Sequence, residues 1–208
     1  DLETGIECGL DLNVKNIAIS STDGISRFIS LKDFSKSKYS SQFRKLQTQL
    51  SRRYLKKNFS KNTKKLQLKQ NKIQRKIKNQ KEDQFHKISN DLTNNFDRIT
   101  IENLQVKKMK ESQKTRLNRL ISDVSWNSLI QKLKYKSEMK NKIIREIDPA
   151  FTSQRCFKCG HTSKNNRKSQ SDFSCLNCGN TENADINASL NILWYDKWSL
   201  EQMTLISS

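Results

Sequence analysis

The sequence predicts an α/β fold built around one mixed sheet, with a helical insertion and a small cysteine module. Three observations predict it. Residues 5–31 show a strand pattern with a turn signal, residues 34–81 carry apolar side chains at helical spacing, and two Cys-x-x-Cys pairs precede a last apolar helix. With 208 residues, of which 33% are hydrophobic, the chain is long enough for one large domain with a modest core.

The first 31 residues predict three consecutive strands. Apolar positions alternate or run together over residues 6–12, and the pattern repeats over residues 14–20. Asp23-Gly24 is a hairpin turn signal, because glycine readily adopts the positive φ that tight turns need. Residues 25–31 then return as the third strand. We expect this meander to form one side of the sheet.

Residues 34–81 change character, with 17 Lys or Arg and no Asp or Glu. Sparse leucines and isoleucines at roughly helical spacing predict two basic helices, broken near residues 58–62. A solvated charged face usually mixes both signs, so this stretch would repel itself unless a polyanion lay alongside. The basic side chains that we expect to contact nucleic acid are Arg52, Arg53, Lys56, Lys57, Lys64, Lys65, Lys72, Arg75 and Lys76.

The remaining elements alternate between helices and strands. Residues 85–96 predict the end of a helix, residues 98–102 a short strand that ends in Glu102, and residues 113–136 an amphipathic helix. Residues 143–147 predict another strand, which stops before Pro149, the only proline of the chain. A last helix is expected to begin near Asp185, after the cysteine module, and to run through Trp194.

The net charge of +19 predicts a polyanionic partner, either nucleic acid or an anionic membrane surface. A merely soluble basic surface is the alternative. The sequence has neither the run of about 20 apolar residues that spans a bilayer nor the basic start and apolar run of a signal peptide. We therefore expect a cytoplasmic protein, associated with the nucleoid in a prokaryote, that does not enter a membrane.

Four of the five cysteines predict a zinc site. Cys156 and Cys159 form one Cys-x-x-Cys pair, Cys175 and Cys178 form the other, and fifteen residues separate the pairs. Such pairs can present four thiolates tetrahedrally to one zinc ion, which leaves no position for a substrate water, so the zinc would be structural. The fifth cysteine, Cys8, is expected to be a small buried residue in the first strand.

Three acids stand where phosphodiester chemistry would need them: Asp11 in the first strand, Glu102 at the end of a later strand, and Asp185 at the start of the last helix. Carboxylates that converge from separate elements can hold two magnesium ions, which cleave phosphodiesters in line. Singly each acid is a weak signal, since an Asp at a helix start is more often an N-cap. Lys15 and Arg155 are candidates to neutralise the scissile phosphate.

Several segments together resemble the C-terminal half of the TnpB, or OrfB, family of insertion-sequence proteins, which are related to type V CRISPR effectors. Residues 9–16 (GLDLNVKN) resemble the first nuclease motif of the family, residues 101–104 (IENL) the second, and residues 185–192 (DINASLNI) the third. Residues 148–154 (DPAFTSQ) resemble the approach to its zinc module, and residues 121–126 (ISDVSW) are a further similar stretch.

The resemblance implies an RNase H-like, RuvC-type fold and a transposon-associated, RNA-guided DNA endonuclease. It implies Asp11, Glu102 and Asp185 as catalytic magnesium ligands, and DNA and a guide RNA as partners. It also implies a nuclease core at residues 1–150 with the basic insertion at 34–97, a zinc ribbon of the type that binds target nucleic acid at 151–181, and a C-terminal helix of the core at 182–208.

Two residues depart from the family pattern, and one region of the family is missing. Asn13 stands where glycine is usual, and Asn183 stands where an auxiliary Asp is frequent. The first strand begins within ten residues of the start, so we expect either a chain truncated before its guide-binding region or one whose guide-binding duties belong to another molecule. The alternative is a catalytically incompetent DNA- or RNA-binding remnant. A third interpretation, a protein-binding zinc module with acids as helix caps, does not account for the charge of residues 34–81.

Overall fold

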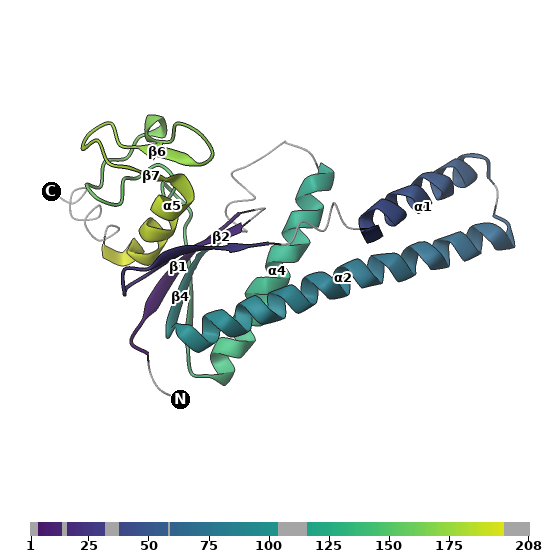
Figure 1. Cartoon of the computed structure of the whole chain (residues 1–208), viewed down its shortest axis with the longest axis horizontal. Coiled ribbons are helices and arrows are strands. Elements are labelled where there is room, and N and C mark those ends of the chain that lie inside the picture. Colours follow the sequence, from purple (N-terminus) through teal and green to yellow (C-terminus); the bar gives the residue numbers. More distant parts are fainter. Residues whose placement is uncertain (1–3, 14–15, 32–37, 58, 104–115, 198–208) are drawn as a thin grey trace. The chain divides into compact units, whose positions relative to one another are not determined.

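The computed structural model describes residues 4–13, 16–31, 38–57, 59–103 and 116–197, without the side chains of 116–125 (Figure 1). The chain divides into two compact units. We call residues 1–31 and 89–208 the sheet unit, and residues 32–88 the helical unit. The predicted Lys15 therefore lies outside the described residues.

The sheet has five strands in the order β3-β2-β1-β4-β5. β1 (Glu7–Leu12) pairs antiparallel with β2 (Asn16–Ser21), which pairs antiparallel with β3 (Ser26–Ser30). On its other side β1 pairs parallel with β4 (Arg98–Glu102), and β4 pairs parallel with β5 (Ile143–Ile147). The predicted mixed sheet is confirmed, and the amino-terminal meander supplies its antiparallel part.

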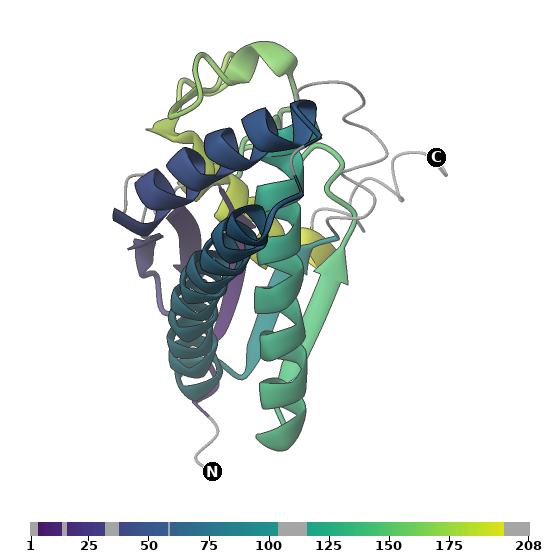
Figure 2. The same cartoon turned by 90° about the vertical axis from the view of Figure 1, so that its right-hand side faces the viewer.

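Helices cover both faces of the sheet. α5 (Ala184–Leu193) packs on one face, and α4 (Arg116–Met139) packs on the other, as Figure 2 lets the reader follow from the side. Because side chains alternate along a strand, Leu10 and Ile101 point to the α4 face and are fully buried. These strand residues are apolar because helices cover both faces of the sheet, as is usual for strands that have parallel neighbours.

α5 lies unusually close to the sheet because Gly9 has no side chain. A Cβ atom built on Gly9 would lie 2.3 Å from the carbonyl oxygen of Ser189 and 2.4 Å from the backbone nitrogen of Leu193. The hydroxyls of Ser20 and Ser189 also form a buried hydrogen bond of 2.7 Å across the same contact. The glycine therefore fixes the height of α5 above β1.

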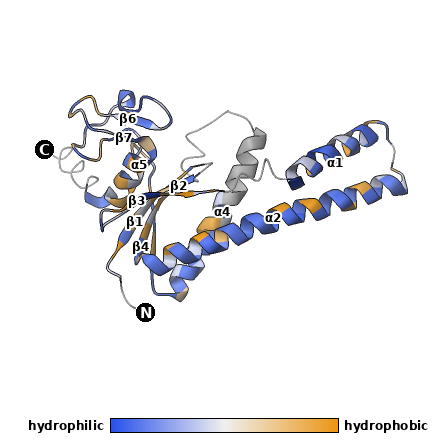
Figure 3. Cartoon of the chain, in the orientation of Figure 1, coloured by the Kyte–Doolittle hydropathy of each residue, from blue (hydrophilic) through white to orange (hydrophobic). Residues whose placement is uncertain are grey.

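The helical unit consists of α1 (Lys38–Leu55) and most of α2 (Lys61–Asn95), which continues into the sheet unit. Figure 3 shows both helices as largely hydrophilic. The buried apolar side chains of these helices within the helical unit are Leu46, Leu50, Ile73, Phe85 and Ile88. The prediction of two basic helices with a break near residues 58–62 is confirmed, and Lys57, with a φ of +50°, lies in the turn that follows the first helix. The basic side chains of both helices therefore face solvent, as expected for the polar face of an amphipathic helix.

The cysteine module precedes α5. It contains a short 3₁₀ helix η2 (Lys164–Asn166) and a two-stranded sheet of β6 (Asp172–Ser174) and β7 (Thr181–Asn183). Its small core consists of Cys156, Phe173, Cys175 and Ala184. With so few apolar residues, such a module needs a metal or another cross-link to be stable.

The other predicted elements also form, with shifted ends. The amphipathic helix expected at residues 113–136 spans Arg116–Met139, and its Leu129 and Leu133 are fully buried. Trp194, which we expected inside the last helix, is its C-cap and is 45% exposed. None of the helices that the structure describes combines the length and apolar character needed to cross a bilayer.

Candidate active site and metal centre

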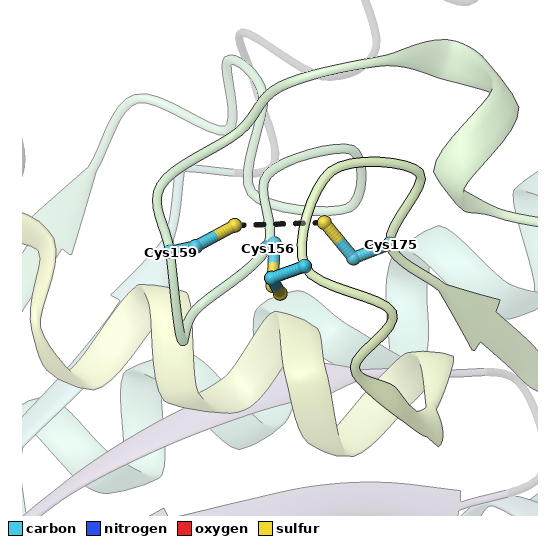
Figure 4. Close-up of side chains that lie close together, drawn as sticks. Cys156, Cys159 and Cys175 are labelled. Atoms are coloured by element: carbon cyan, nitrogen blue, oxygen red, sulfur yellow. Dashed lines mark hydrogen bonds between the residues drawn. The ribbon is translucent and has the colours of Figure 1, made fainter.

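The four cysteines of the module come together. Their sulfur atoms all lie within 4.8 Å of one another. Cys156 and Cys178 are 3.8 Å apart, and Cys159 and Cys175 are 3.5 Å apart, sulfur to sulfur. Zinc–sulfur bonds of about 2.3 Å in a tetrahedron give sulfur separations of about 3.8 Å. Figure 4 shows the labelled cysteines converging from two loops. The cluster has the dimensions of a metal site.

The thiols of the cluster have unequal acidities when no cation is present. Burial raises the pKa of Cys156 to about 12. Burial also acts on Cys159, but hydrogen bonds from the backbone of His161 and from neighbouring thiols outweigh it and lower the pKa to about 6. A divalent cation would hold all the sulfurs as thiolates, so metal binding must release protons, and affinity for the metal must fall in acid.

Asp11 and Glu102 stand at the same edge of the sheet. Leu10 of β1 pairs with Ile101 of β4, and each acid is the next residue of its parallel strand. Asp11 is two residues after Gly9, which faces α5, so alternation places its side chain on the α5 face. Glu102 shares that face, because Thr100 pairs with Gly9. Asp11 is 5% exposed and Glu102 6%, so both are buried acids.

Each of these buried carboxylates is held by a neighbouring polar side chain. The amide of Asn13 donates to Asp11 Oδ2 at 2.9 Å. The hydroxyl of Thr152 donates to Glu102 Oε1 at 2.5 Å, a contact between residues 50 positions apart. Buried carboxylates require such partners, since an unpaired buried charge is costly. Neither Asn13 nor Thr152 was predicted as part of the site.

Asp185 lies in the first turn of α5 and is 9% exposed. It is not the cap of this helix. Asn183 is the N-cap, and its Oδ1 accepts from the backbone N–H groups of Asp185 at 2.9 Å and Ile186 at 3.4 Å. The Asp185 carboxylate instead pairs with Arg167 of the cysteine module, 3.4 Å away. The interpretation of Asp185 as an ordinary N-cap is therefore wrong.

Two buried asparagines of α5 hold the segment that leads into the first cysteine pair. Asn187 and Asn191 both donate to the carbonyl oxygen of Arg155, at 2.8 and 2.7 Å. Asn191 also donates to the carbonyl of Thr152 at 2.9 Å, and Asn187 accepts from the backbone N–H of Phe157 at 3.1 Å. Residues 152–157 thus lead into the cysteine module, accept and donate hydrogen bonds with α5, and contact Glu102 through the Thr152 hydroxyl.

Arg155 itself is turned toward the cysteine loop. Its guanidinium donates to the carbonyl oxygen of Gly160 at 2.5 Å, and the residue is only 9% exposed. Because its guanidinium is buried and bonded to the cysteine loop, Arg155 is poorly placed to neutralise the scissile phosphate, the role expected for it from the sequence. The fixed guanidinium instead ties Gly160, which has a φ of +78°, to the start of the module.

The three acids are more widely spaced than the cysteines. All three are buried and come from β1, β4 and α5. Their oxygens do not all lie within 4.8 Å of one another, whereas the cysteine sulfurs do. The nine predicted basic residues all lie in the helical unit.

Comparison with known protein families identifies the chain. Residues 1–113, more than half of the sequence, match the OrfB_IS605 family model, which is described as "Probable transposase". The chain belongs to the OrfB_IS605 family. Residues 126–192 of this OrfB_IS605 protein also match the model described as "Cas12f1-like, TNB domain", which covers α4 from Trp126, the cysteine module and most of α5.

Curated relatives of this OrfB_IS605 protein are described as nucleases. It is 37% identical over 198 residues to "Putative RNA-guided DNA endonuclease InsQ" of Escherichia coli (strain K12), a match that covers 89% of this chain and 48% of InsQ. It is 41% identical over 75 residues to "CRISPR-associated endodeoxyribonuclease Cas12f1" of Sulfoacidibacillus thermotolerans, over 36% of this chain and 18% of that protein. The chain therefore spans about half, or less, of these relatives.

A solved structure supports the fold. The OrfB_IS605 protein resembles a chain of the "Cryo-EM structure of CRISPR-Cas12f Ternary Complex" with a TM-score of 0.64 and 25% identity, over 91% of this chain and 38% of the other. The RNase H-like, RuvC-type fold class that the sequence predicted is thus confirmed. The cysteine cluster before α5 is consistent with the zinc ribbon of that prediction.

Proposed function

We propose that this chain is the nuclease part of a transposon-associated, RNA-guided DNA endonuclease. Its substrates would be DNA phosphodiesters, and its catalytic side chains would be Asp11, Glu102 and Asp185. The descriptions of InsQ and Cas12f1 support the activity, although this chain spans only part of each relative. The observation that carries the assignment is the burial of three acids from β1, β4 and α5, two of them adjacent in register at one edge of the sheet.

The protein would orient the carboxylates and leave the bond-breaking chemistry to magnesium. Two bound magnesium ions would supply an activated water and stabilise the leaving oxygen. Asn13 and Thr152 hold Asp11 and Glu102, which reduces the side-chain entropy lost when a cation and substrate bind. The Asn183 cap frees the Asp185 side chain from capping its own helix.

The four cysteines would hold one structural zinc ion. Their separations match a tetrahedral thiolate site, and four protein ligands leave no open position for a substrate. The metal would stabilise a module whose own core is four residues. Because α5 follows this module directly, the zinc would also fix where the helix that carries Asp185 begins.

The helical unit would bind the nucleic acid. Its acid-free basic stretch, with 17 Lys or Arg over residues 34–81, provides phosphate contacts on one hairpin. DNA and a guide RNA are the partners that the relatives' descriptions support. Affinity for either should fall steeply with salt, because each neutralised phosphate releases a counterion.

The test is cleavage by the purified protein in magnesium, with and without guide RNA. Asp11→Ala should abolish cleavage and leave the fold intact, because Asp11 contributes a ligand at the rim of the sheet. Asp83→Ala removes an exposed acid of α2, 63% exposed at its side chain, and serves as the matched control. Equal cleavage by the protein and Asp11→Ala would refute the assignment. Salt-sensitive binding without cleavage under any metal would favour the binding-remnant alternative.

A further inference from the structure

A basic groove runs between the two helices of the helical unit. Its volume is about 780 Å³. The lining residues are Gln49, Arg52, Arg53, Leu55, Lys56, Asn62, Lys65, Leu66 and Lys69. Five of the nine are cationic and none is acidic. Cationic side chains that face each other across a groove repel, so the groove is complementary to a polyanion and not to another basic helix.

Exposed apolar side chains surround the end of this groove. Tyr54 and Leu55 end α1, and Phe59 follows in the turn before α2. Phe59 is 74% exposed, Leu55 84% and Tyr54 40%. The rings of Tyr54 and Phe59 are neighbours, with centroids 6.0 Å apart and planes tilted by 44°. Leu55 belongs both to this apolar tip and to the lining of the groove, so the two surfaces are continuous.

The combination of a phosphate groove and exposed rings selects among nucleic acids. Phosphates alone are offered equally by duplexes and single strands. The flat face of a base is available for stacking only where the base is unpaired, and stacking on an aromatic ring stabilises a bound single strand. A hairpin that needed only phosphates would gain nothing from a ring that is 74% exposed at Phe59.

We propose that the α1–α2 hairpin binds an unpaired stretch of RNA, with its phosphates in the groove and a base stacked on Phe59 beside Tyr54. This rests on the proposed function, in which RNA is a resident partner. RNA is favoured over DNA because folded RNA presents loops with splayed bases, whereas target DNA arrives as a duplex. The hairpin therefore recognises the unpaired state of the strand, and the groove alone recognises its charge.

Two side-chain contacts between α1 and α2 hold the two helices of the hairpin together. The Arg53 guanidinium donates to the hydroxyl of Thr63 at 3.4 Å, which links α1 to the first turn of α2. Farther along, Lys76 lies 5.3 Å from the centre of the Tyr39 ring, a second contact between the helices. Neither contact involves the Phe59 ring, and the Lys76–Tyr39 contact lies far along the helices from the turn, so a substitution of Phe59 should not open the hairpin.

The experiment measures binding without cleavage. The Asp11→Ala chain, without magnesium, is titrated into a labelled RNA single strand, the same RNA in a duplex, and a DNA strand of the same sequence. Phe59→Ala should weaken binding to the RNA strand about tenfold, which corresponds to about 1.4 kcal/mol, and change duplex binding less than twofold. Its salt dependence should not change, because no charge is lost.

Two matched variants separate stacking from charge and from exposure. Lys65→Gln should weaken single strand and duplex alike and reduce the salt slope by about 1, as expected for one phosphate contact. Phe28→Ala removes an aromatic ring that is 42% exposed on β3, outside the hairpin, and should leave RNA binding unchanged. Thermal unfolding of each variant checks that the fold is retained.

Three results would overturn the proposal. RNA binding by Phe59→Ala that matches the parent protein would show that the tip contacts something else, such as protein. An equal loss for duplex and single strand would refute recognition of unpaired bases. A DNA strand as tight and as sensitive to Phe59→Ala as RNA would refute the choice of RNA. None of these results depends on cleavage, so they are distinguishable from a failure of the proposed nuclease activity.

Discussion

Gly9→Ala is the sharpest test of how the fold positions the candidate site. The added Cβ would lie 2.3 Å from Ser189 O, 2.4 Å from Leu193 N and 2.9 Å from Leu193 Cα, where an ordinary contact begins at 3.4 Å. The shortfall at Ser189 is therefore about 1.1 Å. All three atoms are backbone, so no rotamer change can relieve the clash, and α5 must move away from β1 as a unit.

This movement should affect stability and catalysis together. Overpacking of this kind costs about 1–3 kcal/mol. A displacement of about 1 Å at a catalytic group can lower the rate about 100-fold. α5 carries Asp185, whereas Asp11 and Glu102 stay on the sheet, so the shift changes the spacing among the three acids. We expect a lower melting temperature and a loss of cleavage larger than that stability change explains.

Gly24→Ala is the control for this prediction. Gly24 has a φ of +86° and no atom within 4 Å of its built Cβ, so alanine there is strained but does not touch α5. The strain should cost about 1–2 kcal/mol, similar to the cost at Gly9. Thermal unfolding and magnesium-dependent cleavage are measured for both variants. If both lose cleavage equally at matched stability, or if Gly9→Ala cleaves normally, the positioning argument is refuted.

Three further predictions follow from the contacts of the sheet unit. Cys175→Ser should bind less than one zinc per chain by metal analysis and should also lose cleavage; full cleavage without zinc would refute the coupling between module and active site. Thr152→Val should lower the cleavage rate about tenfold and stability by about 1–2 kcal/mol, because the bond to Glu102 is lost, with recovery in Thr152→Ser. The hydrogen bond from Lys142 lowers the pKa of the Asp97 carboxyl below its ordinary value of 3.8. The ionised carboxylate therefore stabilises the folded protein above pH 3.8, and this stabilisation is lost as the pH falls through the lowered pKa. The difference in melting temperature between the protein and Asp97→Asn should therefore shrink in acid, and a constant difference would contradict this.

The sequence predicted the elements well because their signals are local. Apolar alternation, the Asp23-Gly24 turn and helical spacing of leucines each act within a few residues, and the corresponding strands and helices form. The cysteine cluster was also predictable, because paired Cys-x-x-Cys spacing constrains the loops that carry the ligands. Element ends were less predictable, as at Trp194, because caps depend on single side chains.

The partners of the acids were not predictable from local patterns. Thr152 meets Glu102 across 50 residues, and Arg167 meets Asp185 from inside the cysteine module. A threonine in a loop and an arginine among lysines carry no signal for such roles. The exposure of the Phe59 side chain was also not predictable from the sequence, because it depends on where the chain turns between the two helices. These contacts exist only after the sheet, α5 and the module have assembled.

At both departures from the family pattern, the asparagine makes a hydrogen bond next to an acid of the candidate site. A glycine at position 13 could not make the 2.9 Å bond by which Asn13 holds Asp11. At position 183 an aspartate could also cap α5, but it would add a negative charge two residues from Asp185, which is paired with Arg167. The Asn183 amide caps the helix without that repulsion.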